Sequence, residues 1–84
     1  MATMTRDEVV TALVGQGTAK DKAVQYADAF EEYRVASANI AEHGVVVAHP
    51  RTGAPLVNPY LAIRDKALQK LQSMRDVKAA FLWA

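Results

Sequence analysis

The sequence predicts a mostly α-helical fold in which two long helices form an antiparallel hairpin. Residues 18–43 and 59–82 contain no internal glycine, and apolar residues recur in both at three- and four-residue steps. The segment between them, 45–58, is rich in valine and is interrupted by proline and glycine. Two helices of similar length with a compact connector are typical of a helical hairpin. A chain of 84 residues is also short enough for one domain, so we expect residues 1–84 to form a single helical domain.

A short helix over residues 5–15 precedes the hairpin. Thr5 and Glu8 have the spacing of a capping box, in which the hydroxyl and the carboxylate each bind a free backbone N–H. Gly15 and Gly17 end the apolar pattern, because glycine relieves the strain of turn conformations.

The first long helix is predicted to start at Thr18 and to stop before Gly44, with His43 favourably placed at the negative end of the helix dipole. Its apolar face is marked by aromatic, aliphatic and small residues at helical spacing, namely Ala23, Tyr26, Ala27, Phe30, Tyr33, Ser37, Ile40 and Ala41.

The connector over residues 45–58 is predicted to be a small β-hairpin or an ordered loop at the tip of the helical hairpin. Its valines favour an extended chain. Pro50 and Gly53 are typical turn residues. Asn58 is then a good N-cap for the return helix, with Pro59 at the first helical position, where its missing N–H is not needed.

The return helix is expected over residues 59–82, but its apolar stripe drifts after Met74. Arg75 and Lys78 fall within the stripe there, which indicates a bend or an end near Arg75. Trp83 lies outside any stripe, and two interpretations stay open. It folds back onto the hairpin, or it anchors a subunit or partner contact, as tryptophan often does.

Two arginines fall inside apolar arcs, Arg34 in the first long helix and Arg64 in the second. Because a charge in an apolar stripe is costly unless it is paired or reaches water, each either meets an acidic residue or lies in a subunit interface or basic channel.

Composition favours self-association and leaves the partner open. Apolar residues make up 51% of this small chain, and association is the simplest way to cover the surplus. Residues 1–44 hold four basic and seven acidic residues, a net of −3, whereas 45–84 hold six and two, a net of +4. Either the two helices pair with each other, or the basic half binds an acidic partner such as DNA.

Several functional classes are disfavoured. Without cysteine there is no disulfide or thiolate metal site. No apolar segment is long enough to span a membrane, and the N-terminal sequence does not have the pattern of a secretory signal peptide. We therefore expect a cytosolic protein without a membrane partner. Ser37 and Ser73 lack a nucleophile elbow, and His43 and His49 lack further ligands. We therefore expect no catalytic residue, no metal and no cofactor.

The stretch from Tyr33 to Met74 resembles the small-subunit family of tailed-bacteriophage terminases. The likeness lies in "EHG" followed by valines, a proline–glycine turn, then "NPYL", a basic–acidic pair and helically spaced leucines. The resemblance implies a non-catalytic protein that forms a homo-oligomeric ring in the host cytoplasm. It also implies recognition of double-stranded viral DNA and its delivery to the large terminase subunit.

The site residues follow from charge and apolarity rather than from a family motif. The DNA-binding candidates are the basic residues of the second half and of the start of the first long helix, namely Arg64, Lys66, Lys70, Arg75, Lys78, Lys20 and Lys22. The oligomer-interface candidates are residues of the two long helices and the tail, namely Tyr26, Phe30, Tyr33, Arg34, Ile40, Leu61, Leu68, Leu71 and Trp83.

An alternative function is a helical protein–protein interaction module, such as a dimer, that does not bind DNA. A helix-turn-helix regulator built from residues 8–27 fits less well, because the front of its second helix is apolar and a recognition helix offers polar side chains to base edges.

Overall fold

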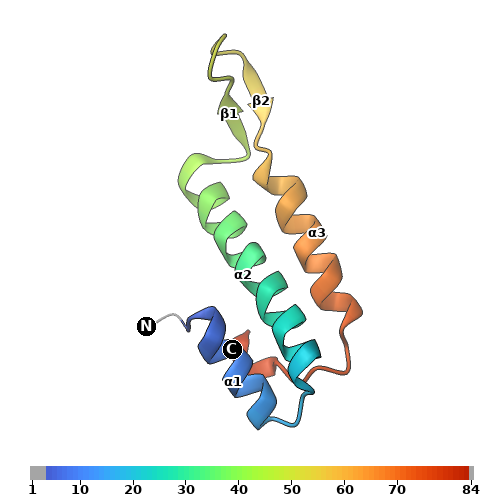
Figure 1. The fold of residues 1–84 in the computed structure, drawn as a ribbon. Coiled ribbons are helices and arrows are strands. Elements are labelled where there is room, and N and C mark those ends of the chain that lie inside the picture. Colours follow the sequence, from blue (N-terminus) through green and yellow to red (C-terminus); the bar gives the residue numbers. More distant parts are fainter. Residues whose placement is uncertain (1–3, 84) are drawn as a thin grey trace.

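The computed structural model describes residues 4–83 and is mostly helical with one small antiparallel sheet, as predicted. The elements are α1 (Arg6–Gly15), α2 (Lys20–His43), β1 (Val46–Ala48), β2 (Pro55–Val57), α3 (Tyr60–Ser73) and a 3-10 turn, η1 (Ala80–Leu82). Figure 1 shows α2 and α3 side by side and running in opposite directions, with the two strands projecting at one end. We call that end the tip and the opposite end, where α1 and the C-terminal tail lie, the base.

The predicted capping box starts α1. The Glu8 amide donates to Thr5 Oγ1 at 3.3 Å, and the Thr5 amide donates to Glu8 Oε1 at 3.2 Å. At the other end Gly17 has φ +97°, and its amide donates to the Val14 carbonyl. This left-handed turn directs the chain into α2.

Helix α2 begins two residues later than predicted and has no side-chain cap. The reason is that the Thr18 amide donates to the Leu13 carbonyl at 3.0 Å, so Thr18 still belongs to the turn that ends α1. Gly44 ends α2 as expected. It has φ +87°, and its amide donates to the Ile40 carbonyl at 2.7 Å.

The connector is a β-hairpin whose register pairs Val46 with Val57 and Ala48 with Pro55. Asn58 fastens its base. The buried Asn58 side chain donates to Asn39 Oδ1 at 3.1 Å and to the Gly44 carbonyl at 2.9 Å, and it accepts from the Tyr60 amide at 3.0 Å. Helix α3 starts at Tyr60, so Pro59 takes the N-cap position that was predicted for Asn58, and it has no side-chain cap bond of its own. Asn58 still binds the first amide of α3, as the predicted cap would, and it also links the end of α2 to the start of α3.

The predicted extent of the last helix, residues 59–82, is wrong beyond residue 73. Helix α3 ends at Ser73, whose hydroxyl donates to the Lys70 carbonyl at 2.7 Å. A turn follows, and Val77 and Ala79 are buried in the core. Val77 lies off the apolar stripe of α3, so a continuous helix would leave it outside the core, whereas a bend near Arg75 brings it in.

The core lies at the base, where α1, α2, the end of α3 and the tail meet. Its buried members are mostly small or aliphatic, namely Val9, Leu13, Ala23, Tyr26, Ala27, Ala29, Leu71, Val77 and Ala79. The alanines on α2 let neighbouring elements approach closely. No helix among residues 4–83 is long and apolar enough to cross a membrane.

Candidate nucleic-acid interface

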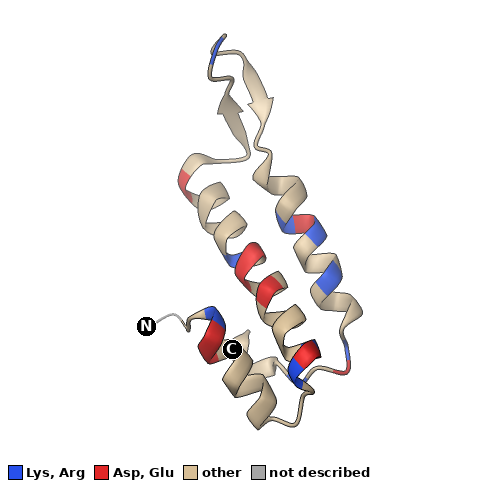
Figure 2. Ribbon diagram, viewed as in Figure 1, with Lys and Arg blue, Asp and Glu red and all other residues tan. Residues whose placement is uncertain are grey.

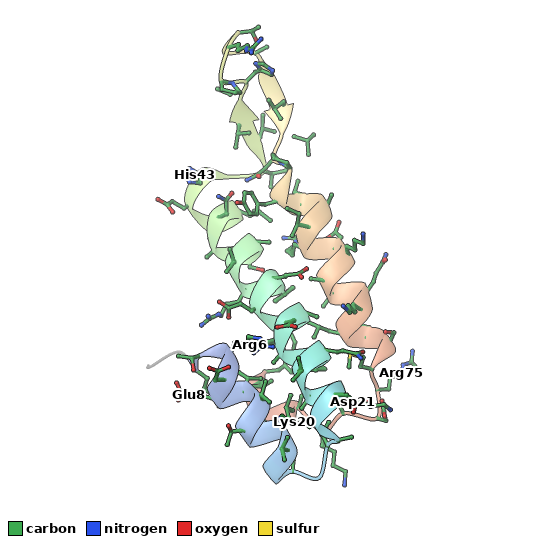
Figure 3. All side chains as sticks on the ribbon, viewed as in Figure 1. Arg6, Glu8, Lys20, Asp21, His43 and Arg75 are labelled. Atoms are coloured by element: carbon green, nitrogen blue, oxygen red, sulfur yellow. The ribbon has the colours of Figure 1, made fainter. Side chains whose placement is uncertain are left out.

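The fold brings two separately predicted basic groups together at the base. Lys20 and Lys22 lie in the first turn of α2, and Arg75 and Lys78 lie in the segment after α3. Figure 3 shows Lys20 and Arg75 at the same end of the molecule. We call these four residues the basal cluster. All four are exposed.

A shallow hollow of about 230 Å³ joins the two halves of the basal cluster. Lys22 and Lys78 line it together with Asp76 and the turn between α1 and α2, residues 17–19. Lys78 also borders a neighbouring hollow together with Arg75. Lys22, Lys78 and Arg75 therefore border adjoining hollows although they come from distant parts of the sequence. Lys20 lies at the same end of the molecule but lines neither hollow, and it points about 200° away from Lys22 because the two are two positions apart on a helix.

Acidic neighbours reduce the charge of the basal cluster without cancelling it. Lys22 Nζ forms an ion pair with Asp76 Oδ2. The hydrogen bond from Lys22 lowers the pKa of Asp76, and the same contact raises the pKa of Lys22. Asp21 lies in the first turn of α2. The four cations against these two carboxylates leave a net charge of +2 on this surface.

The N-terminus of α2 adds to the positive potential at the base. The amides of its first turn have no side-chain cap. The aligned peptide dipoles place partial positive charge at this end of the helix. Lys22 and Lys78 therefore lie beside a backbone end that itself attracts anions.

The three predicted basic residues of α3 do not form one patch. Lys66 and Lys70 are exposed and lie one helical turn apart, so they share a face. Arg64 is half-buried, and its Nη2 lies 3.5 Å from Asp65 Oδ1. It points about 200° away from Lys66, because each helical residue turns by about 100°. Figure 2 shows the basic positions on α3 beside acidic positions on α2.

The predicted interface residues divide into three groups. Tyr26 and Leu71 are buried in the core of the single chain. The second group is half-buried on the two long helices, namely Phe30, Tyr33, Arg34, Ile40, Leu61 and Leu68. Trp83 is 45% exposed. The Arg34 guanidinium binds Glu31 Oε2 at 2.6 Å. This is the first of the two alternatives for Arg34, pairing with an acidic residue of the same chain.

Trp83 folds back onto α2, as the first of the two interpretations of this residue predicts. Its indole Nε1 donates to Tyr26 Oη at 2.9 Å. Its ring meets Phe30 edge-on at a centroid distance of 5.1 Å and Tyr33 at 5.4 Å. One side of the ring stays open, and there Trp83 and Leu68 border a shared apolar hollow.

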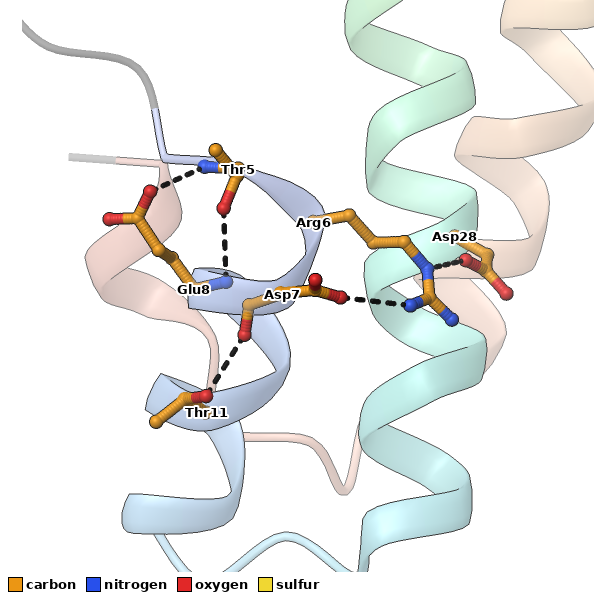
Figure 4. Close-up of polar contacts among 6 residues, drawn as sticks. All are labelled: Thr5, Arg6, Asp7, Glu8, Thr11 and Asp28. Atoms are coloured by element: carbon orange, nitrogen blue, oxygen red, sulfur yellow. Dashed lines mark hydrogen bonds and ion pairs between the residues drawn. The ribbon is translucent and has the colours of Figure 1, made fainter.

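Sequence reasoning missed the ion pair that ties α1 to α2. Figure 4 shows Arg6 reaching from the first turn of α1 to Asp28, with Asp7 beside it. The hydrogen bond from Arg6 lowers the pKa of Asp28, and the charge of Lys70 acts in the same direction. No periodicity could reveal this pair, because its partners are 22 residues apart on two helices.

The histidines have structural surroundings. His49 Nδ1 accepts from the Arg51 amide at 3.1 Å within the β-turn. His43 lies 3.9 Å from Glu42 at the end of α2. Among residues 4–83, no group of three or more His, Asp or Glu side chains is arranged to hold a metal ion.

Comparison with known proteins gives one match. A family model described as phage terminase, small subunit, matches residues 2–76, which is most of the 84-residue chain. No curated protein and no solved structure matches the chain.

Proposed function

The chain belongs to the phage terminase small-subunit family, and from this premise we propose that it is a DNA-recognising adaptor of viral genome packaging. The family implies a role in phage DNA packaging in the host cytoplasm, and small subunits are generally the non-catalytic component. In this proposal the protein binds double-stranded viral DNA and presents it to the large terminase subunit, which supplies the motor and nuclease activities.

The basal cluster carries the DNA-binding part of the proposal. DNA affinity comes largely from phosphate contacts by lysine and arginine. Lys22, Arg75 and Lys78 offer three such contacts beside two adjoining hollows, and Lys20 is a fourth exposed cation at the same end of the molecule. Lys22 is partly engaged by Asp76. Lys78 and Arg75 form no ion pair within the described residues, so they are the stronger candidates.

Self-association into a ring is the second part of the proposal. A ring needs one contact between two different surfaces, repeated by rotation. The half-buried apolar side chains of α2 and α3 supply one such surface, around Tyr33, Leu61, Leu68 and the open side of Trp83. The exposed valines of the connector supply further apolar area, with Val46 58% and Val57 64% exposed.

The test of the DNA-binding part is a double charge reversal, Arg75→Glu with Lys78→Glu. Fluorescence anisotropy with a labelled DNA duplex of about 30 base pairs should show at least tenfold weaker binding, since two phosphate contacts become repulsive. The slope of log affinity against log salt should fall by about 2 units in magnitude, or about 0.9 for each lost phosphate contact.

The matched control is Arg51→Glu, which reverses a charge at the tip, far from the base. It should change the affinity by less than twofold. Circular dichroism should show unchanged helix content in all variants, because all three side chains are exposed. Equal affinity of the double variant and the native protein would remove the basal cluster from the DNA interface.

The alternative, a protein-interaction module without DNA binding, is favoured by the apolar hollow beside Trp83. The same titration separates the two functions. DNA binding through phosphates weakens steeply with salt, whereas association through an apolar surface changes little.

A further inference from the structure

The face of α2 that points away from Trp83 carries two acidic side chains. Phe30 touches the Trp83 ring, which fixes the direction of that part of α2. Residues two positions away on a helix point about 200° away. Asp28 and Glu32 therefore lie on the opposite side of α2. We call this side of the α2–α3 pair the front face and the Trp83 side the back face.

Helix α3 presents two basic side chains on the same front face. Leu68 borders the hollow beside Trp83, so it marks the back face. Lys66 lies two positions before Leu68 and Lys70 two positions after it. Both therefore point about 200° away from Leu68, toward the front face. The charge of Lys70 contributes, after the hydrogen bond from Arg6, to the lowered pKa of Asp28, as expected if both lie on one face.

The acidic and basic residues occur at matching heights along the two helices. The hydrogen bond between Asn58, just before α3, and Asn39 on α2 sets the alignment of the two helices. Glu32 lies seven residues before Asn39 on α2, and Lys66 lies eight residues after Asn58 on α3, so the two are at about the same height. Counting four further along each helix leads to Asp28 and Lys70.

A third level on the front face is apolar. Four residues back from Asn39 and five forward from Asn58 lead to Val35 and Ile63. These side chains are 51% and 44% exposed. The front face thus carries an acidic residue on α2 and a basic residue on α3 at each of two levels, and one apolar residue on each helix at the third level.

This pattern is complementary to itself. A half-turn about an axis parallel to the helices places α2 of a second copy over α3 of the first without changing its height. Each acidic residue of α2 then faces a basic residue of α3 in the other copy, and valine faces isoleucine. The symmetry repeats every such contact once. We propose that the front face pairs two copies of this chain, with Asp28 facing Lys70, Glu32 facing Lys66 and Val35 facing Ile63 of the second copy.

Contacts within one chain explain only part of the front face, because Asp28 is bound by Arg6 of α1 whereas the other three charged residues have no such partner among residues 4–83. Among the described residues, Glu32, Lys66 and Lys70 form no ion pair within 4.0 Å. The exposed Val35 and Ile63 also gain no cover from the hairpin itself. The pairing rests on the self-association in the proposed function and adds to the ring contact a second one, in which the same face of both copies meets. It leaves the basal cluster and the back face free.

The first experiment compares Glu32→Lys, Lys66→Glu and the variant that carries both changes. Light scattering coupled to size exclusion, over a range of protein concentrations, measures the association. Each single reversal should weaken the pairing by about tenfold, because it alters two symmetry-related charge contacts. The double variant restores opposite charges across the contact, so it should recover most of the association. Glu42→Lys, an exposed reversal near the tip, is the matched control and should have no effect.

The second experiment fixes the geometry. The chain has no cysteine, so Val35→Cys and Ile63→Cys each introduce a single thiol. When the two variants are mixed under mild oxidation, disulfides should form mainly between one Val35→Cys chain and one Ile63→Cys chain. Each variant alone should crosslink poorly, because a half-turn brings residue 35 to residue 63 and not to itself.

Three results would overturn the pairing. One is a mass that the single reversals leave unchanged. Another is a double variant as weakened as the single ones. The third is crosslinking of each cysteine variant with itself. If the charges act only within one chain, the reversals lower the melting temperature at every concentration and leave the mass unchanged. DNA affinity, measured on the same variants, reports separately on the basal cluster.

Discussion

Replacing Asn58 with alanine should destabilise the protein strongly, although the residue lies far from the apolar core. Its side chain is 2% exposed and makes three hydrogen bonds, to Asn39, to the Gly44 carbonyl and from the Tyr60 amide. Alanine would leave the two backbone groups without a partner in a site with little access to water. Each net hydrogen bond contributes about 1 kcal/mol, and an unsatisfied buried group costs about 1–3 kcal/mol.

These contributions suggest a loss of about 3 kcal/mol in the free energy of unfolding. Because a small domain has only about 5–15 kcal/mol in total, the effect is large. Urea denaturation followed by circular dichroism at 222 nm measures it at one fixed protein concentration. Gln69→Ala is the control, since Gln69 is an exposed amide side chain of α3 and its loss should change stability by less than about 0.5 kcal/mol.

A loss below about 1 kcal/mol for Asn58→Ala, with unchanged helix content, would refute the reasoning, because one cap alone accounts for that much. It would mean that water replaces the side chain at the junction. Asn58→Asp adds a second check. It keeps the acceptor for the Tyr60 amide but sets a carboxylate against the Asn39 and Gly44 oxygens, so it should rescue little of the loss.

Three further perturbations follow from the fold. Gly44→Ala forces a side chain into φ +87° and should cost about 1–3 kcal/mol in a thermal melt, whereas Gly15→Ala, at a helical position with open space around it, should be neutral or slightly stabilising. Trp83→Ala removes the aromatic contacts with Phe30 and Tyr33 and should lower stability by about 2–3 kcal/mol in urea, with Trp83→Phe recovering part; equal stability of all three proteins would show that the tail does not dock. The pKa of Asp28 is lowered in the folded state, so its contribution to stability is present above pH 4 and lost as the pH falls through its folded pKa; Asp28→Asn should flatten the melting temperature between pH 5 and pH 2, and an unchanged slope would contradict the link between Arg6 and Asp28.

Local signals predicted much of this fold. The capping box at Thr5, the stop at Gly44 and the capping bond of Asn58 each depend on a few neighbouring residues, and each is present. Helix α2 starts later than the side-chain pattern predicts, because the Thr18 amide completes the preceding turn. That competition between two adjacent elements is not visible in the side-chain pattern.

Contacts between distant segments could not be predicted from the sequence. The tail is positioned by the bond from Trp83 to Tyr26, across 57 residues, and by the burial of Val77. The basal cluster likewise arises because the bend after α3 brings Lys78 beside Lys22. Charge identified these basic residues as candidates, but only the chain path shows which of them lie together.

The uneven distribution of the core has a consequence for motion. The apolar core cluster lies at the base, whereas the tip is a two-stranded sheet with three residues in each strand. Such a sheet is marginally stable alone in water. Amide protons of the strands should therefore exchange with solvent much faster than those of α2 near Ala27, with the Asn58 junction as the boundary between them. The molecule thus joins a rigid base to an adaptable tip, which can adjust its shape to a partner while the base keeps its own.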